Sequence, residues 1–103
     1  MKLLTKDIIK LFKKYWNQSN SSDPVVICKF FNPTWAWSWY VTEYIEEDRL
    51  FYGYVSIFWD HCDEWGYFLL DELEIFRWRF GLKIERDISF EPIRFSLLGL
   101  NKD

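Results

Sequence analysis

The side chains that could bind a metal are concentrated in one pentapeptide, Asp60-His61-Cys62-Asp63-Glu64. Thiolate, imidazole and carboxylate groups are the ligands of zinc, and a structural zinc site takes four of them, usually as two pairs well separated in the chain. Outside this segment the one remaining cysteine is Cys28, and the sequence has no second histidine. We therefore predict a polar loop here, with no metal and no cofactor.

Residues for catalysis are equally sparse. A nucleophilic pair of Cys62 and His61 would need a third group that orients the base, and none is identifiable. Glu85, Arg86 and Asp87 could supply an active-site carboxylate with an arginine partner, but a structural ion pair at the entry to a strand is the better interpretation. The chain has no phosphate-binding glycine loop, no dinucleotide fingerprint and no internal repeat. We predict that the protein is not an enzyme.

The element around which we expect the chain to be organised is a long aromatic hairpin between Phe31 and Trp59. With a period of two, one face of its first half collects large apolar residues, as in a half-buried strand. These are Trp35, Trp37, Trp39, Val41 and Ile45, with Phe51, Val55, Ile57 and Trp59 continuing the face in the second half. The other face collects Tyr40, Thr42, Tyr44, Tyr52, Tyr54 and Ser56. The charged residues 46–49 form the bend.

The alternation also predicts the register of the hairpin. Pairing the apolar residues with one another places Ile45 opposite Phe51, Val41 opposite Val55 and Trp39 opposite Ile57, which requires an odd number of residues in the turn. The alternative places Ile45 opposite Leu50 and mixes the two faces across the strands. We predict the first register.

The elements before the hairpin are a helix and a strand. Residues 4–16 place apolar side chains at helical spacing with lysines elsewhere on the wheel, which predicts an amphipathic helix that starts at a Thr5 cap and covers the sheet. Such a basic helix could also bind an anionic surface or nucleic acid. Val25–Phe31 is typical of a strand. Asn32 and Pro33 end that strand in a tight turn.

After the hairpin, residues 65–70 resume a strand pattern and a second short helix near 72–80 follows. Asp71 is its expected cap, with Glu74 three residues on, and Gly81 supplies the left-handed residue that ends it. The expected buried stripe is Leu69, Leu73, Phe76 and Phe80. The tail predicts one or two short edge strands, the first around Asp87–Glu91, because an edge tolerates Pro92.

Together these elements predict a single α+β domain over residues 1–103: an antiparallel sheet of about 4–6 strands built on the aromatic hairpin, an N-terminal amphipathic helix and the second short helix. Half of the residues are hydrophobic and 22% are aromatic, which excludes disorder over most of the length. No export-type segment and no apolar run long enough to span a bilayer is present. We expect a cytoplasmic protein with no membrane contact and with reduced cysteines.

The charge is distributed unevenly. Between Glu43 and Glu74 ten acids accompany Arg49 alone, which gives −9, and the rest of the chain is +6. Such asymmetry can steer a basic partner toward the acidic side, and tryptophan and tyrosine are residues that anchor interfaces. A solvated rim that keeps an aromatic sheet from aggregating is the other interpretation.

Three segments, FNPTWAWSWYVTEYIEEDRLFYGYV, WGYFLLDELE and FGLKIERDISFEP, carry a family resemblance. They resemble a family of small uncharacterised bacterial domains, classed as a domain of unknown function and carried largely by plasmids, phages and other mobile elements. About 60 of the 103 residues lie under this resemblance, and the first 20 or so lie outside it. The positions that match the family signature are Asn32, Pro33, Trp39, Tyr40, Glu43, Tyr44, Gly53, Gly66, Gly81, Glu85, Arg86 and Asp87.

One branch of that family is described as type II-A anti-CRISPR proteins. The resemblance therefore implies a non-enzymatic inhibitor that docks on a type II-A RNA-guided nuclease, in its bare or guide-loaded form, and blocks DNA targeting or cleavage. Such nucleases hold nucleic acid in basic channels, which an acidic domain could occupy. The expected electrostatic contacts are Glu46, Glu47, Asp48, Asp60, Asp63 and Glu64, and the expected anchors are Trp35, Trp59 and Trp65.

The alternative function is single-stranded nucleic-acid binding, or another accessory role on a mobile element. Aromatic faces on a small sheet can stack bases, and five lysines lie within the first fourteen residues. The acids around the hairpin oppose this function because they repel phosphates.

Overall fold

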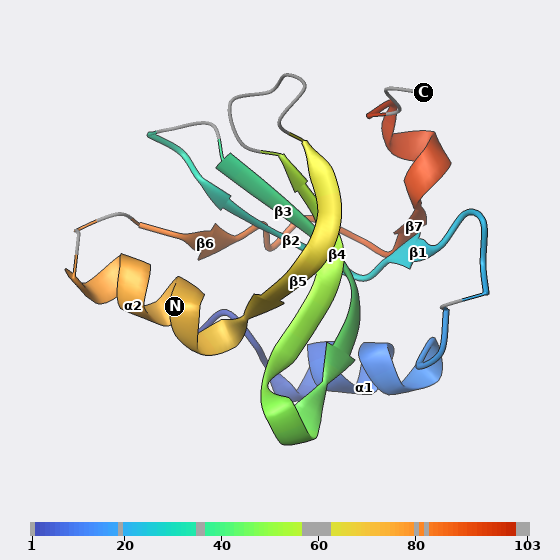
Figure 1. Ribbon diagram of the computed structural model, residues 1–103, viewed down its shortest axis with the longest axis horizontal. Coiled ribbons are helices and arrows are strands. Elements are labelled where there is room, and N and C mark those ends of the chain that lie inside the picture. Colours follow the sequence, from blue (N-terminus) through green and yellow to red (C-terminus); the bar gives the residue numbers. More distant parts are fainter. Residues whose placement is uncertain are drawn as a thin grey trace.

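The computed structural model describes residues 2–18, 20–34, 37–56, 63–79, 81 and 83–100, the side chains of 77–79 excepted. The helices are α1 (Lys6–Lys14) and α2 (Leu70–Arg79), with two short 3-10 helices, η1 (Glu46–Asp48) and η2 (Phe95–Leu98). The strands are β1 (Val25–Val26), β2 (Cys28–Asn32), β3 (Trp37–Ile45), β4 (Leu50–Ser56), β5 (Glu64–Leu69), β6 (Glu85–Arg86) and β7 (Ile93–Arg94) (Figure 1).

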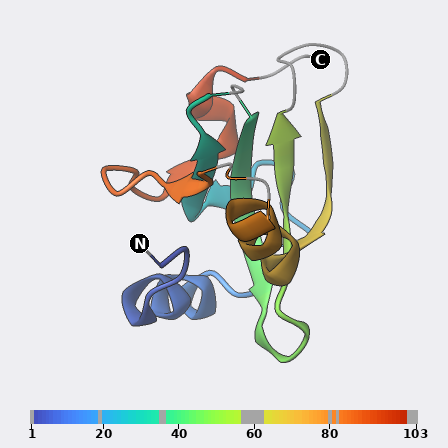
Figure 2. The same ribbon diagram turned by 90° about the vertical axis from the view of Figure 1, so that its left-hand side faces the viewer.

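Five of the strands form one antiparallel sheet in the order β5-β4-β3-β2-β6, and β1 pairs with β7 in a second, two-stranded sheet. The predicted α+β fold, with its helix at each of the expected places, is confirmed. The meander β2-β3-β4 and the strand that follows it also match the prediction. Figure 2 shows the strands of the main sheet next to one another, with β5 along the right-hand border.

Each face of the main sheet is covered by different elements. On one face Phe12 of α1 and Leu73 of α2 join a core that includes Phe30, Trp39 and Phe51. On the other face Val26, Tyr40 and Tyr54 are buried, and residues of the tail, from Phe90 to Leu100, pack over them. A sheet covered on both faces explains why so many aromatic residues are needed, since both layers must be filled.

The strands β3 and β4 pair in a register that differs from the predicted one. A β-bulge interrupts β3 between Val41 and Glu43, so that one residue of β3 has no counterpart in β4. The observed pairs are Ile45 with Leu50 near the turn and, beyond the bulge, Val41 with Gly53 and Trp39 with Val55. The turn has four residues, 46–49, and not an odd number. The predicted register is therefore wrong.

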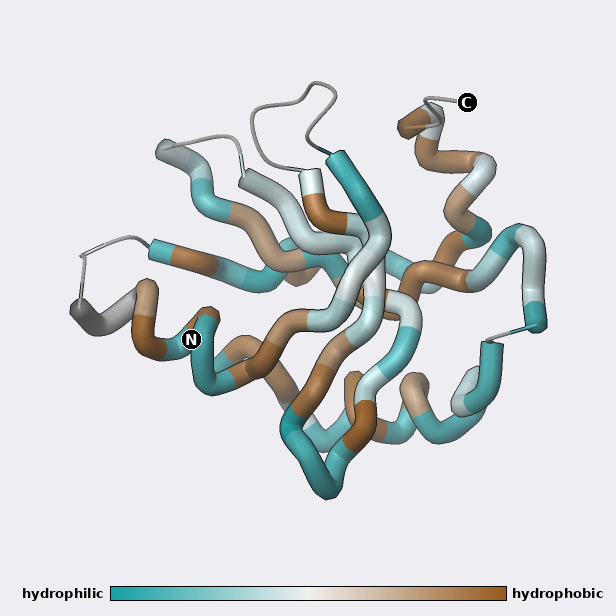
Figure 3. Tube along the Cα trace, in the orientation of Figure 1, coloured by the Kyte–Doolittle hydropathy of each residue, from teal (hydrophilic) through white to brown (hydrophobic). Residues whose placement is uncertain are grey.

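The bulge has a clear physical effect on which side chains are buried. It reverses the alternation of faces, so Tyr44 packs against the same core as Trp39 and Val41. Ile45, which the simple alternation places on the buried face, is 37% exposed. Figure 3 shows the hydrophilic turn at the lower tip of the hairpin, between the hydrophobic ends of the two strands.

The helix ends follow local hydrogen bonding. Thr5 caps α1 as predicted, with its hydroxyl accepting from the Ile8 N–H at 3.2 Å. The start of α2 is displaced from the prediction, because the Glu72 carboxylate accepts from the Leu69 N–H at 3.2 Å. This is the reciprocal bond of a capping box whose cap is Leu69 rather than Asp71.

The buried residues of α2 and the position of the first tail strand also differ in part from the prediction. Leu70 and Leu73 are buried, whereas Leu69 and Phe76 are each 37% exposed and Phe80 lies outside the described residues. Gly81 has the expected left-handed backbone, with φ of 66°. The first tail strand is β6, not Asp87–Glu91, since the Asp87 carboxylate accepts from the Ser89 N–H and turns the chain there.

Candidate functional site

The predicted acidic contacts fall into two groups at opposite ends of β5. Glu46, Glu47 and Asp48 are exposed in η1, at the tip of the hairpin. Asp63 and Glu64 begin β5, whose other end adjoins that tip through the pairing of Leu50 with Leu69. A six-residue strand separates the two groups by about 20 Å. Asp60 lies outside the described residues.

The start of α2 adds its own acids to the group at the hairpin tip. Asp71 accepts from the Arg49 guanidinium at 2.9 Å, and the Leu70 N–H donates to the Arg49 carbonyl at 2.9 Å. The hydrogen bond to Asp71, together with the charge of that carboxylate, raises the pKa of Arg49, and Glu74 adds to this effect. The tip and the first turn of α2 therefore form one acidic end of the strand.

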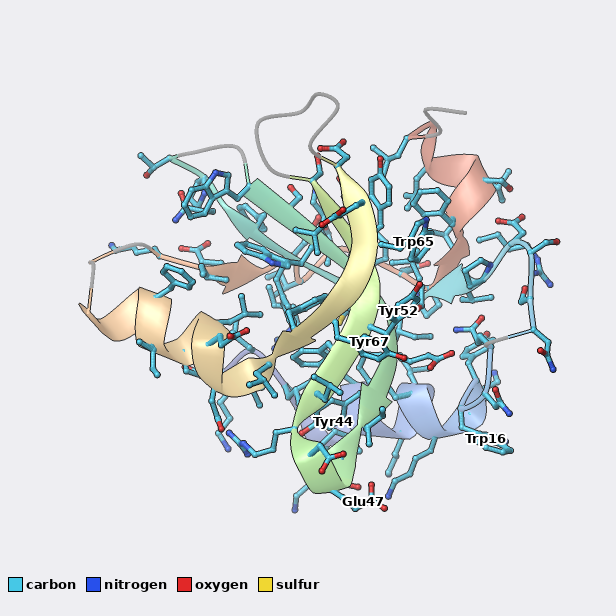
Figure 4. All side chains as sticks on the ribbon, viewed as in Figure 1. Trp16, Tyr44, Glu47, Tyr52, Trp65 and Tyr67 are labelled. Atoms are coloured by element: carbon cyan, nitrogen blue, oxygen red, sulfur yellow. The ribbon has the colours of Figure 1, made fainter. Side chains whose placement is uncertain are left out.

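The segment between the acidic ends carries aromatic side chains. Trp65 is half-buried, stacks on Tyr52 with ring centroids 5.8 Å apart and contacts Phe95 at 4.8 Å. Tyr67, two residues along the strand, is 66% exposed and contacts Tyr52 at 4.8 Å. Figure 4 shows Tyr52, Trp65 and Tyr67 gathered beside β5. Of the three predicted tryptophan anchors only Trp65 is described; Trp35 and Trp59 lie outside the described residues.

These rings form one wall of a shallow groove of about 480 Å³. Thr42 and Glu43 line it beside Tyr52, and Gln18, Ser21, Ser22 and Pro24 line its opposite wall. The groove is thus aromatic on one side and polar on the other. This mixture is typical of surfaces that recognise a partner by ring contacts and a few hydrogen bonds.

Gln18 builds the polar wall. Its side-chain amide donates to the carbonyls of Val25 (2.9 Å) and Thr42 (3.0 Å) and accepts from the Val25 N–H at 2.6 Å. Its backbone N–H donates to the Glu43 carboxylate at 3.1 Å. Two of these bonds hold Gln18 at the bulge of β3, and the other two join it to Val25 of β1. The bond to Glu43 explains why this signature residue lies in the groove.

Sequence reasoning did not select Tyr52, Tyr67 or Gln18 as site residues. The alternation of β4 and β5 could have placed Tyr52 and Tyr67 on one face, because they pair directly. No sequence pattern signals Gln18, which acts through contacts about 25 residues away in the chain.

Most of the signature positions have structural roles. Asn32 accepts from the Thr34 N–H at 2.9 Å and closes the predicted turn before Pro33, and Trp39, Tyr40 and Tyr44 fill the two cores. A Cβ on Gly53 would lie 2.2 Å from the Tyr40 carbonyl oxygen, so any larger residue at this position forces the backbone to move.

The cluster at 85–87 serves the fold in the same way. Glu85 and Arg86 form β6 against Phe31 and Phe30. Arg86 donates to the Lys2 carbonyl, and the Asp87 N–H donates to the Lys29 carbonyl at 2.9 Å.

Burial and neighbouring groups shift the pKa of a few side chains among the described residues. Burial raises the pKa of the Cys28 thiol far above its ordinary range, which leaves it protonated and unreactive. The pKa of Tyr54 is raised by burial and by the neighbouring Asp63 carboxylate, which accepts from the Tyr54 hydroxyl at 3.3 Å. Among the described ranges no three histidine, cysteine or acidic side chains are grouped for a metal ion.

The fold and this surface define a small α+β domain with an aromatic strand set between acidic ends. The chain belongs to the family described as "Protein of unknown function (DUF2958)", whose model matches residues 3–97. The match begins at residue 3, so the expectation that the first 20 or so residues lie outside the family is wrong. No curated protein and no solved structure matches the chain. None of the described helices is long and apolar enough to cross a membrane.

Proposed function

We propose that the protein is a non-enzymatic inhibitor that docks on a type II-A RNA-guided CRISPR nuclease and blocks its DNA targeting or cleavage. The observation that supports this function is the aromatic part of β5, with Trp65 and Tyr67, between two groups of carboxylates. The identity of the partner comes from the resemblance to a protein family that mobile elements carry and that has an anti-CRISPR branch. The proposed place of action is the cytoplasm of a bacterial host.

The physics of this docking follows from the two kinds of group on the surface. A nuclease that holds nucleic acid presents basic channels, and carboxylates at both ends of β5 would steer the protein toward them and fix its orientation. Aromatic rings in the centre of an interface contribute most of the binding energy once water is excluded. Tyr67 is the exposed ring in this position, and Trp65 supports it from within the groove.

A pull-down that compares the bare nuclease with its guide-loaded form, followed by a DNA cleavage assay, tests the partner and the inhibited state. We expect inhibition that weakens as salt rises, because exposed charges are screened. Replacing Glu46, Glu47 and Asp48 together by lysine is expected to abolish inhibition. Full inhibition by this triple variant would rule out a contact through the hairpin tip.

A matched control separates local contact from net charge. The double variant Glu47→Lys/Asp48→Lys changes the net charge as much as Asp7→Lys/Glu91→Lys, and all four side chains are exposed. We expect the first variant to inhibit at least tenfold less well than the second. Equal inhibition by the two variants would show that only net charge matters.

Single-stranded nucleic-acid binding is the second candidate, and the exposed Tyr67 ring beside Tyr52 is the observation that favours it. Rings on a sheet can stack bases, but this function also needs a basic track for the phosphates. Glu43 lies in the groove beside these rings. Filter binding to single strands at low salt distinguishes the two functions, since the proposed inhibitor is expected to leave the strands unbound.

A further inference from the structure

The border of the main sheet at β5 has its hydrogen-bonding groups available. The sheet ends at β5 on one side and at the two-residue β6 on the other, and within the described residues no strand pairs with the outer edge of β5. In Figure 2 this edge is the right-hand margin of the ribbon. An edge strand whose outward N–H and C=O groups have no strand partner is a template for a further strand.

Two bonds at the end of β5 show which residues face outward. The Leu70 N–H donates to the Arg49 carbonyl and so points toward β4, whereas the Leu69 N–H is taken by the Glu72 side chain. Backbone groups alternate between the two sides of a strand in an antiparallel ladder. Gly66 and Phe68 therefore bond to β4, and Trp65 and Tyr67 each present an N–H and a C=O at the outer edge.

The charges around this edge indicate the chemistry of an added strand. From residue 63 to residue 74 the chain has five acids and no lysine or arginine. Asp63 and Glu64 stand at one end of β5, and Asp71, Glu72 and Glu74 stand at the other. Two cations among the described side chains lie near the hairpin tip: Arg49 pairs with Asp71 at 2.9 Å, and Lys13 lies 3.9 Å from Glu46.

We propose that the edge of β5 binds an extended basic segment of a partner protein, which adds as a sixth strand through the N–H and C=O groups of Trp65 and Tyr67. Lysine or arginine side chains at the two ends of the segment would meet the carboxylates at the two ends of β5. Side chains between them would lie on the Trp65 and Tyr67 rings. This inference deepens the proposed function and rests on it only for the identity of the partner as a basic nuclease.

A second copy of this chain is the competing occupant, and the charges disfavour it. Antiparallel pairing of two β5 edges through residues 65 and 67 would place Glu64 opposite Phe68 of the other copy. Asp63 and Glu64 would then approach the acidic first turn of the other copy's α2. Like charges at both ends of the pair would oppose this association.

The test uses a synthetic peptide with two lysines at each end and alternating threonine and valine between them. Amide hydrogen exchange of the isotope-labelled protein is measured residue by residue. We expect saturating peptide to slow the exchange of the Trp65 and Tyr67 amides at least tenfold. The Gly66 and Phe68 amides, already bonded to β4, are expected to change little.

Two control peptides separate charge from strand pairing. One carries glutamate in place of each lysine, and the other is N-methylated at alternate backbone nitrogens, which blocks its pairing with a strand. Both are expected to bind at least tenfold more weakly. Equal binding of either control, or no slowing of exchange by the lysine peptide, would overturn the proposal. Slow exchange at residues 65 and 67 that depends on protein concentration alone would assign the edge to a second copy instead.

A variant of the protein tests the same strand pairing by removing one outward N–H from β5. Tyr67→Pro removes an outward N–H and keeps the bonds to β4, so it is expected to fold and to lose peptide binding at least tenfold. Tyr67→Ala keeps the N–H and should lose less. If Tyr67→Pro fails to fold, the N-methylated peptide still decides the question.

The nuclease assay distinguishes the two proposals. If Tyr67→Pro inhibits the nuclease as well as the unchanged protein does, the proposed contact through the edge of β5 is rejected and the proposed function is not. Peptide binding without any inhibition of the nuclease would reject the proposed function alone.

Discussion

The guanidinium of Arg49 lies 2.9 Å from the carboxylate of Asp71, which joins the hairpin turn to the first turn of α2. Arg49 is also the one residue other than glycine with a positive φ among the described residues, at 52°. Arg49 thus combines an ion pair made by its side chain with a backbone conformation that favours glycine.

The first prediction separates these two properties of Arg49. Arg49→Gly loses the ion pair but suits the left-handed backbone, whereas Arg49→Ala loses the ion pair and keeps the strained conformation. We expect Arg49→Ala to lower the urea midpoint of unfolding more than Arg49→Gly does. Asp71→Asn should have a small effect that disappears at high salt, because both partners are exposed. Equal midpoints for the two Arg49 variants would contradict the role of the backbone.

The second prediction compares two glycines that pair with each other. A Cβ at Gly53 would lie 2.2 Å from the Tyr40 carbonyl oxygen, whereas a Cβ at Gly66 has no heavy atom within 4 Å. Gly53→Ala is expected to lower the free energy of unfolding by about 3 kcal/mol, because backbone must move. Gly66→Ala should leave it unchanged or raise it by up to about 1 kcal/mol. Chemical denaturation of the two variants measures the difference, and similar losses would refute it.

The third prediction concerns the side-chain amide of Gln18. Gln18→Ala leaves the carbonyls of Val25 and Thr42 and the Val25 N–H without this partner, which should lower the free energy of unfolding by about 2 kcal/mol. Gln18→Glu keeps the shape but replaces a donor by a carboxylate oxygen facing two carbonyls. We expect Gln18→Glu at neutral pH to be at least as destabilising as Gln18→Ala, and to recover partly when the carboxyl is protonated. Denaturation at several pH values tests this order.

The fourth prediction is a pH dependence at Asp23. Its carboxylate accepts from the Ser96 hydroxyl at 2.6 Å and the Ser96 N–H at 2.8 Å, and these bonds lower its pKa below the ordinary 3.8. A carboxyl whose pKa is lower in the folded state contributes stability above the unfolded pKa and loses it as the pH falls through the folded pKa. The contribution is therefore present at neutral pH and lost below about pH 4.

The variant Asp23→Asn checks this sign. It is expected to be less stable than the unchanged protein at pH 7 and to lose less of its stability between about pH 4 and pH 2. Ser96→Ala should reduce the pH dependence in the same way. A free energy of unfolding that falls as steeply in Asp23→Asn as in the unchanged protein would show that other carboxylates cause the acid sensitivity.

The elements of the fold were predictable because their patterns are local. The Thr5 cap, the tight turn at Asn32 and the left-handed Gly81 each depend on residues within a few positions of one another. The strand at 65–69 was identified in the same way, whereas the run Val25–Phe31, predicted as one strand, is divided between β1 and β2, which belong to different sheets.

The features that sequence reasoning missed depend on distant contacts. The bulge after Val41 depends on how β3 fits β4, and simple alternation cannot represent an extra residue. Two acids, Glu72 and Glu74, could each complete a capping box, and the tertiary bond between Leu70 and Arg49 accompanies the earlier start. The candidate surface was partly predicted through Glu46, Glu64 and Trp65, but the outward amides of β5 became visible only with the strand order.

The covering of Tyr40 and Tyr54 by the tail has a consequence for biosynthesis. Residues 93–98 leave the ribosome after every strand of the main sheet. The layer around Tyr40 and Tyr54 therefore stays exposed to water until η2 has been synthesised. A nascent chain that stalls before that point would expose this hydrophobic surface, which chaperones or other nascent chains could bind.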